Sequence, residues 1–180
     1  NMKTALSVVI PAHNEEGSIR ETVTSVAGAL EREHIPFEII VVNDHSTDDT
    51  AAILNELVLL IPQIHAMSNE QLPGFGRTVV SGINAANGTY VAIMMADLSD
   101  DPEDLVRFYR AAQETGVDCV FGSRFIPGGM TYDYPRFKLI LNRFANTLVQ
   151  ILFSIRYNDC TNAFKLYKKE TLDGLHPFLS

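Results

Sequence analysis

The sequence predicts an α/β protein in which a mainly parallel sheet has helices on both faces. Short apolar runs rich in Val and Ile alternate with helical patterns along the first two thirds of the chain. Parallel strands that are buried on both faces form such runs, so the alternation is typical of repeated strand–helix units. A chain of 180 residues with 46% hydrophobic content can build one packed core, and we expect a single domain over residues 1–180.

The first half of the chain supplies three of the expected strands. Leu6–Pro11 is an apolar run, and Glu15–Leu30 follows it as a helix with its apolar residues on one face. Phe37–Val42 is a second run, and Ser46–Thr47 is expected to cap a helix that Pro62 ends. A weaker strand is expected over Ile64–Met67.

The second half continues the pattern up to Gly122. The loop Pro73–Gly76 leads to a helix expected over Arg77–Ala86, and Thr89–Met95 is a strand. Pro102 opens a helix that runs to Thr115. The last expected strand is Val117–Gly122.

Beyond Gly122 the alternation fades, and Phe137–Tyr157 is the main apolar segment. Its polar residues argue against a membrane-spanning helix; they are Asn142, Arg143, Asn146 and Gln150. An amphipathic helix fits better, either packed on the sheet or lying against a membrane surface. We recognise neither a spanning segment nor a signal peptide, and we interpret Asn1, before Met2, as a residue left by tag removal.

The net charge of −8 is unevenly distributed. Residues 1–118 carry a net charge of −12, and residues 119–180 carry +4. No extended basic face is available, which argues against nucleic acid as a partner. A local basic region in the second part remains open to a phosphate or an anionic membrane, or to an ordinary solvated surface. Cys119 and Cys160 form no metal or redox pattern, so a reducing cytoplasm is the default.

Polar side chains follow three of the expected strands at the point where each ends. These segments are Pro11–Glu16, Val42–Thr50 and Met95–Ser99. The carboxyl ends of parallel strands are where open α/β sheets bind ligands, and carboxylates there suit a hard divalent cation that holds a diphosphate. Asp100 or Asp101 has a simpler explanation as the cap of the helix at Pro102, whereas Asp97 has none.

Together the three segments resemble the family 2 glycosyltransferases of the GT-A (Rossmann-like) fold, in particular the dolichol- or polyprenyl-phosphate mannosyltransferase-like branch. That branch has Val-Ile-Pro-x-x-Asn-Glu, then Asp-Asp-x-Ser-x-Asp-x-Thr, then Asp-x-Asp followed by Asp-Pro-Glu. Its Gly-Ser-Arg and Gly-Gly elements are similar to Gly122–Arg124 and Gly128–Gly129, and its Asp-x-x-Ser-Gly-Phe is similar to Asp159–Phe164. The resemblance covers residues 5–170.

The resemblance implies roles for individual residues. The nucleotide-sugar site would comprise Pro11, Ala12, His13, Glu15, Asn43, Asp44, Ala96 and Asp97. Glu15 would reach the ribose or base, Asp44 would accept a hydrogen bond from a base N–H, and Asp97 would coordinate Mg²⁺ or Mn²⁺. Arg124, with Arg136 or Lys138, would hold the phosphate of a lipid acceptor.

The chain departs from the family pattern at several positions. Met95 replaces the first Asp of Asp-x-Asp, so Ser99, a neighbouring carboxylate or water would complete the metal site. Asn43 and His45 replace the usual Asp and Gly of the second motif, and Asn162-Ala163 replaces Ser-Gly. The family continues beyond the point that corresponds to Ser180, so we expect a longer catalytic domain.

The resemblance implies an inverting, metal-dependent transfer of a hexose from a nucleotide sugar to a polyprenyl or dolichyl phosphate. GDP-mannose is the first choice of donor, and a UDP-hexose is the second. A phosphate acceptor is largely ionised near neutral pH, its second pKa being about 6, so it needs cations more than a base. The expected location is the cytoplasm, at the inner face of the membrane. Two alternatives are transfer to a glycan hydroxyl with Asp159 as catalytic base, and a non-catalytic nucleotide-sugar binding module, which Met95 suggests.

Overall fold

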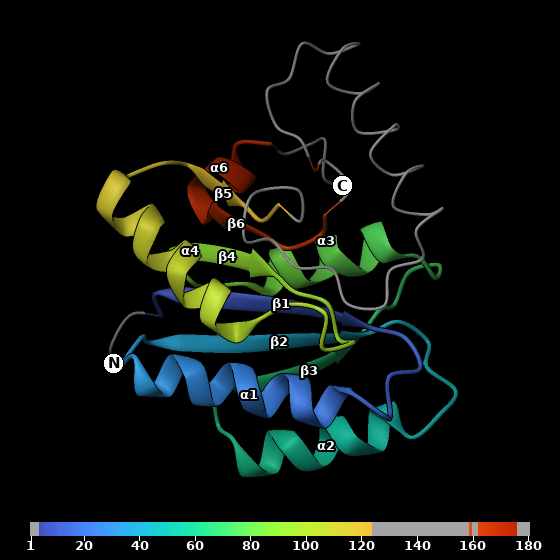
Figure 1. Cartoon of the computed structure of the whole chain (residues 1–180). Coiled ribbons are helices and arrows are strands. Elements are labelled where there is room, and N and C mark those ends of the chain that lie inside the picture. The colour runs from blue at the N-terminus through green and yellow to red at the C-terminus, as the bar shows by residue number, and fades with distance from the viewer. Residues whose placement is uncertain (1–3, 124–158, 160–161, 176–180) are drawn as a thin grey trace, which may run out of the picture. The chain divides into compact units, whose positions relative to one another are not determined.

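The computed structural model describes residues 4–123, 159 and 162–175, and it shows a sheet with helices on both faces (Figure 1). In the described ranges the strand order is β3-β2-β1-β4-β6-β5. The strands are β1 (Leu6–Ala12), β2 (Phe37–Asn43), β3 (Ile64–Ser68), β4 (Tyr90–Ile93), β5 (Cys119–Phe121) and β6 (Lys165–Lys168). The helices are α1 (Ile19–Arg32), α2 (Thr50–Leu60), α3 (Phe75–Ala85), α4 (Pro102–Thr115) and α6 (Lys169–Asp173).

The sheet is mainly parallel, as predicted. Strand β1 lies between β2 and β4 and is parallel to both, and β2 is also parallel to β3. Strand β6 pairs with β4 in the antiparallel direction. The five predicted strands are all present, whereas β6 and α6 were not predicted from the sequence.

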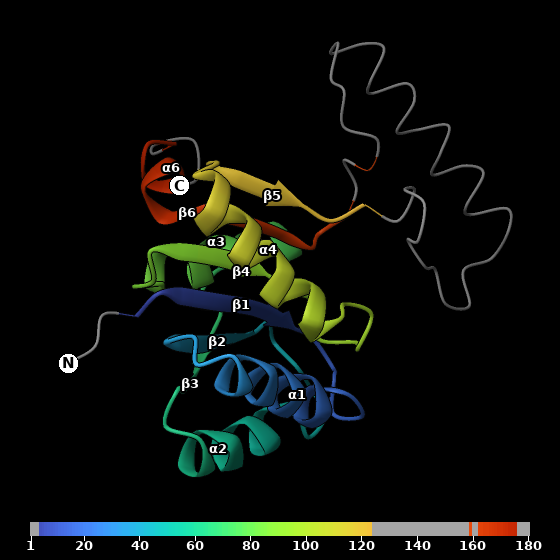
Figure 2. The ribbon, with the colours of Figure 1, turned by 60° about the vertical axis from the view of Figure 1, so that its left-hand side comes forward.

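Alternating side chains of the central strands divide the core into two layers. Val8 of β1 and Ile39 of β2 belong to the layer covered by α1, α2 and α4. Val9 and Ile40, the next residues of the same strands, belong to the layer covered by α3 and α6. The ribbon shows these helices on the two faces of the sheet (Figure 2). Gly82 lets α3 lie close to β1, because a Cβ at this position would be 2.3 Å from Val9 Cγ1.

The helices start and end close to their predicted bounds, with two late starts. Helix α1 begins at Ile19 rather than at Glu15, and α2 begins at Thr50 rather than after Ser46–Thr47. None of the helices in residues 4–123 and 162–175 is long and apolar enough to cross a membrane.

The chain divides into two compact units. The first comprises residues 1–120 and 164–180, and the second comprises residues 121–163. The single domain over residues 1–180 stays a prediction. All of the β1, β2 and β4 loops discussed next belong to the first unit.

Candidate nucleotide-sugar site

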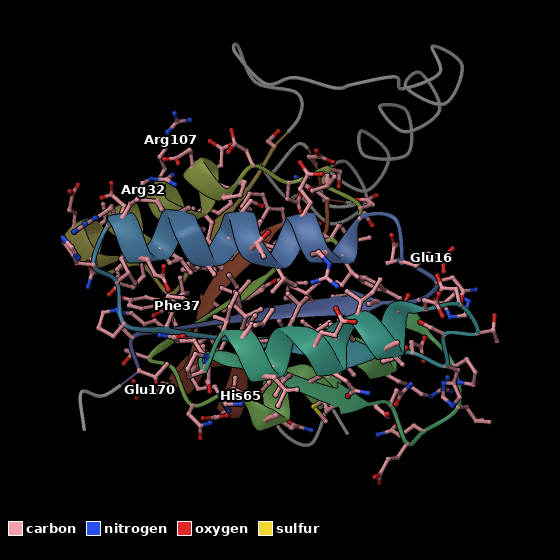
Figure 3. The ribbon with its side chains drawn as sticks, turned by 90° about the horizontal axis from the view of Figure 1, so that it is seen from below. Glu16, Arg32, Phe37, His65, Arg107 and Glu170 are labelled. Atoms are coloured by element: carbon pink, nitrogen blue, oxygen red, sulfur yellow. The ribbon has the colours of Figure 1, made fainter. Side chains whose placement is uncertain are left out.

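Three loops leave the carboxyl ends of β1, β2 and β4 at the same edge of the sheet. Ala12 and Asn43 are paired in the parallel register of β1 and β2, so the residues that follow these two strands are neighbours. Figure 3 shows α1 and α2 side by side, with Glu16 at this end and Arg32 and Phe37 at the other. The three polar segments thus follow the carboxyl ends of parallel strands, as predicted.

Each of these loops contains a residue with left-handed backbone. Asn14, His45 and Leu98 have φ angles of 56°, 58° and 62°. Such conformations cost energy for residues other than glycine, and in proteins they gather at ligand sites. Leu98 is notable because it has no polar side chain to compensate and is 45% exposed. The backbone at this edge is therefore held in a strained, specific shape.

The loops after β1 and β2 are joined to each other by hydrogen bonds. His13 Nδ1 lies 2.6 Å from the carbonyl oxygen of Asp44, which requires a proton on Nδ1 because a carbonyl only accepts. Asn14 N–H donates to Ser46 Oγ at 2.9 Å, and Thr47 N–H donates to Asn14 Oδ1 at 2.7 Å. Ser46 and Thr47 thus fasten the two loops together and do not cap α2, which corrects the prediction.

Just before α1 and α2, side-chain oxygens of each loop accept hydrogen bonds from backbone N–H groups of the other. Glu15 N–H donates to Thr50 Oγ1 at 2.8 Å, and Glu16 N–H donates to Asp48 Oδ2 at 3.1 Å. In return, Asp49 N–H donates to Glu16 Oε2 at 3.0 Å. Desolvation acts to raise the pKa of Asp48, but hydrogen bonds from Thr50 and from backbone N–H groups outweigh it and lower that pKa. This exchange explains why both helices begin later than predicted.

Pro11, Ala12 and Glu15, which were predicted to line the nucleotide pocket, lie at this edge with unequal exposure. Pro11 and Ala12 are buried, and Glu15 is half-buried. The Glu15 carboxylate accepts a hydrogen bond from Ser18 Oγ at 2.8 Å, beside the first turn of α1. Its contact with a ribose or base stays a prediction.

Asp44 is a buried carboxylate with several donors around it. Its Oδ1 accepts from Asn69 Nδ2 at 2.7 Å, and its Oδ2 accepts from Gly74 N–H at 2.9 Å. Burial acts to raise the pKa of Asp44, yet hydrogen bonds from Asn69, Gly74 and His45 outweigh it and lower that pKa to about 2. Asp44 is therefore ionised at neutral pH, and it ties the end of β3 to the start of α3.

The loop after β4 is held by side chains on both sides of Asp97. Thr22 of α1 donates its hydroxyl to the carbonyl of Ala96 at 2.9 Å, and both residues are buried. Met95 N–H donates to Asp100 Oδ2 at 2.7 Å, and β4 ends at Ile93 rather than at Met95 as predicted. Asp97 itself is exposed, and its Oδ1 accepts from Ser99 N–H at 3.1 Å. Backbone strain and hydrogen bonds thus present the Asp97 carboxylate to solvent.

Asp101 has the structural role that was the simpler explanation for it. Its carboxylate accepts from Glu103 N–H at 2.8 Å as the N-cap of α4, with Pro102 in the first turn. Asp100 and Asp101 thus accept hydrogen bonds that fix the two ends of this loop, whereas Asp97 fixes neither end.

The donor set at this edge can hold a hard divalent cation only in part. Among the described residues, no group of three or more His, Cys, Asp or Glu side chains is placed to bind a metal. One exposed carboxylate fits Mg²⁺ or Mn²⁺ that takes its remaining ligands from a diphosphate and water. Asp97 is thus the ligand that this loop offers, and the contribution of Ser99 stays a prediction.

Several predicted residues lie in the second unit or outside the described part of the chain. Asp159 is fully buried, and its carbonyl accepts from Asn162 N–H at 3.2 Å. Asn162 Nδ2 donates to the carbonyl of Gly122 at 2.9 Å. Arg124, Arg136 and Lys138, predicted to hold the acceptor phosphate, fall outside the described residues, as does the predicted helix 137–157.

Thr22 and Asn69 were not predicted, and Asp100 was considered only as a helix cap, although each of the three positions a predicted residue. Asp100 could have been recognised from its place in the turn after β4. Asn69 comes directly after β3, and β3 pairs with β2, the strand that Asp44 follows. The sequence carries no further signal for Asn69. Thr22 lies 74 positions before Ala96 in the sequence, and nothing in the helical pattern marks it.

Known proteins resemble this chain over nearly its whole length. The pattern of the glycosyl transferase family 2 matches residues 7–175. A polyprenol monophosphomannose synthase of Mycolicibacterium smegmatis is 33% identical over 172 residues, which are 93% of this chain and 63% of that protein. A dolichol-phosphate mannosyltransferase of Pyrococcus furiosus is 29% identical, over 94% of this chain and 48% of that protein. The chain thus spans about half to two thirds of these relatives.

The fold also matches solved structures. A glucosyl-3-phosphoglycerate synthase from Mycobacterium tuberculosis, in complex with Mn²⁺, UDP and phosphoglyceric acid, superimposes with a TM-score of 0.71. The two share 22% identity, over 94% of this chain and 57% of the other. This likeness confirms the predicted GT-A fold.

Proposed function

The chain belongs to glycosyl transferase family 2, and we propose that it transfers a hexose from a nucleotide sugar to a polyprenyl phosphate with inversion. The observation that carries this proposal is the placement of Asp44 and Asp97 at one edge of the sheet, after the two strands that flank β1 and run parallel to it. Their loops have rigid, strained backbones of the kind that ligand sites show. The named mannosyltransferase relatives support the acceptor class.

In this proposal the two acidic residues serve different parts of the donor. The interlocked loops after β1 and β2 hold the nucleoside, with Asp44 accepting a hydrogen bond from the base. Asp97 holds a divalent cation at the diphosphate, where the cation would offset the charge that develops on the leaving group. Thr22 and Asp100 keep the Asp97 loop in place, so that its carboxylate does not need to reorganise on binding.

The acceptor side of the reaction rests on the basic second part of the chain. A polyprenyl phosphate is already anionic near neutral pH, and Arg124 with Arg136 or Lys138 would orient it without removing a proton. A membrane surface is the natural place for such a lipid, and the proposed location is the cytoplasmic face of the membrane. The nucleotide sugar and the polyprenyl phosphate are thus the two proposed partners.

Calorimetric titration of this chain with UDP and GDP, with and without Mn²⁺, tests the donor site. We expect at least one nucleotide to bind more tightly with Mn²⁺, and we expect Asp97→Asn to remove that increment. Asp104→Asn is the matched control, because it removes the same charge from the first turn of α4, where Asp104 only pairs with Arg107. An unchanged Mn²⁺ increment in Asp97→Asn would contradict the assignment.

Transfer assays with the full-length protein test the acceptor. A mannose- or glucose-labelled donor should give a labelled lipid when polyprenyl phosphate is supplied. Labelling of a glycan instead would favour transfer to a hydroxyl, with Asp159 as the base. Nucleotide binding without any turnover would favour a binding module.

A further inference from the structure

The Asp44 carboxylate has donors on both oxygens before any ligand binds. Oδ1 accepts from Asn69 Nδ2 at 2.7 Å and contacts His45 Nδ1 at 3.2 Å. Oδ2 accepts from Gly74 N–H at 2.9 Å. Asn69 is 4% exposed and also accepts from Gln71 N–H at 3.1 Å through its own Oδ1, which fixes the orientation of its amide. The donors on Oδ1 are therefore built into the fold.

These contacts leave little acceptor capacity for a ligand. An ionised carboxylate offers about four lone-pair positions, two on each oxygen. Because a carboxylate only accepts, the contact with His45 requires a proton on Nδ1, and Oδ1 then has two donors. The Thr78 hydroxyl gives its only proton to the Gly74 carbonyl at 2.9 Å, so it adds no donor to Asp44. Oδ2 therefore has one donor and retains one position, while 11% of the side chain is exposed. Asp44 can thus accept at most one further N–H, and only through Oδ2.

Nucleobases differ in the number of adjacent N–H groups that they offer. Guanine presents its ring N1–H beside its 2-amino group, a pair that matches both oxygens of a free carboxylate. Uracil presents a single N3–H between two carbonyl oxygens. At Asp44, a guanine bound through N1–H would leave its amino group without an acceptor on Oδ1. A buried donor without a partner weakens binding, whereas a single N–H fits the position that remains.

We propose that the donor nucleotide is a uridine diphosphate sugar, and that Asn69 and His45 set this preference by occupying Oδ1 of Asp44. The inference rests on the proposed function, because it assumes that Asp44 meets the base. Asn69 and His45 are positioning residues, since they act on the base through Asp44. Gly74 contributes to the same selection by occupying one position on Oδ2.

His45 makes this preference specific to the present chain. The family pattern usually has glycine at this position, and the left-handed φ of 58° is a backbone conformation that glycine adopts without strain. A glycine there would leave one position on Oδ1 open, and guanine could then pair with both oxygens. The histidine ring therefore separates this chain from relatives that carry glycine.

The test compares the affinities of UDP and GDP for the whole chain by calorimetry with Mn²⁺. We expect the wild type to bind UDP roughly ten- to a hundredfold more tightly than GDP, the range for one buried donor without a partner. In His45→Gly the ratio of UDP affinity to GDP affinity should fall by roughly three- to tenfold. The change should come from tighter GDP binding, because one position on Oδ1 is freed. His45→Gly relieves backbone strain, but it loses the contact with Asp44 and gives the unfolded chain more freedom, so we expect a folded variant whose stability changes little.

His34→Gly is the matched control. His34 also has a left-handed backbone, with φ of 53°, and it is an exposed residue that follows α1 at the opposite end of that helix. The variant His34→Gly should show a similar change in thermal stability and an unchanged ratio of UDP affinity to GDP affinity. Equal or tighter binding of GDP by the wild type would overturn the inference, and so would an unchanged ratio in His45→Gly. Binding of neither nucleotide would instead overturn the proposed function itself.

Discussion

The hydrogen bond from Thr22 to Ala96 links the stability of the first unit to the geometry of the Asp97 loop. Thr22→Val keeps the shape of the side chain and removes the hydroxyl that donates to the Ala96 carbonyl at 2.9 Å. Both residues are buried, at 3% and 1% exposure, so the carbonyl loses its donor away from bulk water. An unsatisfied buried group costs about 1–3 kcal/mol, and the added methyl group recovers part of this, so we expect a net loss of about 1–2 kcal/mol.

Urea denaturation of Thr22→Val measures this loss directly. Thermal melting gives a second measure, because for a chain of this size a loss of 1 kcal/mol in unfolding free energy lowers the melting temperature by about 2–4 °C. Thr24→Val is the control, because Thr24 lies on the same helix, is exposed, and bonds only to carbonyls of its own helix. Its free energy of unfolding should change by less than about 0.5 kcal/mol, as is usual for surface substitutions.

The same variant should affect ligand binding in a selective way. The Ala96 carbonyl lies next to Asp97, so a looser loop should lower the Mn²⁺-dependent part of nucleotide affinity by roughly three- to tenfold. Affinity without metal should not change. If Thr22→Val is destabilised but still folded, and its Mn²⁺ increment is unchanged, then Thr22 supports only the fold. A variant as stable as the wild type would refute the hydrogen-bond argument altogether.

Two further predictions concern the core and the acid stability of the fold. Gly82→Ala should destabilise by about 1–3 kcal/mol in urea, because its Cβ would lie 2.3 Å from a stiff Val9 side chain. Gly76→Ala on the same helix has nothing within 4 Å and should be neutral or stabilising. Because the folded pKa of Asp44 is about 2 and its ordinary value is 3.8, the group stabilises by about 2 kcal/mol above pH 4. This stability should be lost as the pH falls through 2. The melting temperature of Asp44→Asn should therefore fall less steeply with decreasing pH than that of the wild type.

The sequence was sufficient for the central strands because their signal is local. Mostly apolar runs such as Leu6–Pro11 and Phe37–Val42, each with a single polar residue, have few alternatives once they are buried on both faces. The placement of Asp44 and Asp97 at one edge follows from parallel pairing alone. Strand β6 carried no such signal, because Lys165–Lys168 is short and half polar and forms a strand only by pairing with β4.

The roles of individual polar residues could not be predicted because they depend on distant partners. Ser46 and Thr47 have the residue types of a helix cap, yet Asn14 and Asn43, rather than the first turn of α2, are their partners. Asp44 was predicted as a ligand contact, and its bond to Asn69 could not be predicted because the two residues are 25 positions apart in the sequence. Residue type indicates that a group makes hydrogen bonds, but only the fold determines with which group.

The acidic character of residues 1–118 gives a physical reason for the proposed metal dependence that is separate from the family resemblance. Residues 1–118 carry a net charge of −12, and a diphosphate brought to this edge meets several carboxylates. Glu16, Asp48 and Asp100 accept backbone N–H groups, which offset part of their charge, whereas the exposed Asp97 has only the N–H of Ser99. Without a cation, Asp97 should repel the diphosphate.

Asp97→Asn is therefore expected to act in opposite directions under the two conditions of the titration. With Mn²⁺ the variant should lose affinity, because the cation loses its carboxylate ligand. Without Mn²⁺ it should bind the nucleotide slightly more tightly than the wild type, because one negative charge near the phosphates is gone, and this gain should shrink at high salt. Asp104→Asn removes an equal charge from a residue paired with Arg107 and should show no such reversal. A loss of affinity under both conditions would mean that Asp97 contacts the nucleotide directly or supports the loop, and does not act through a metal.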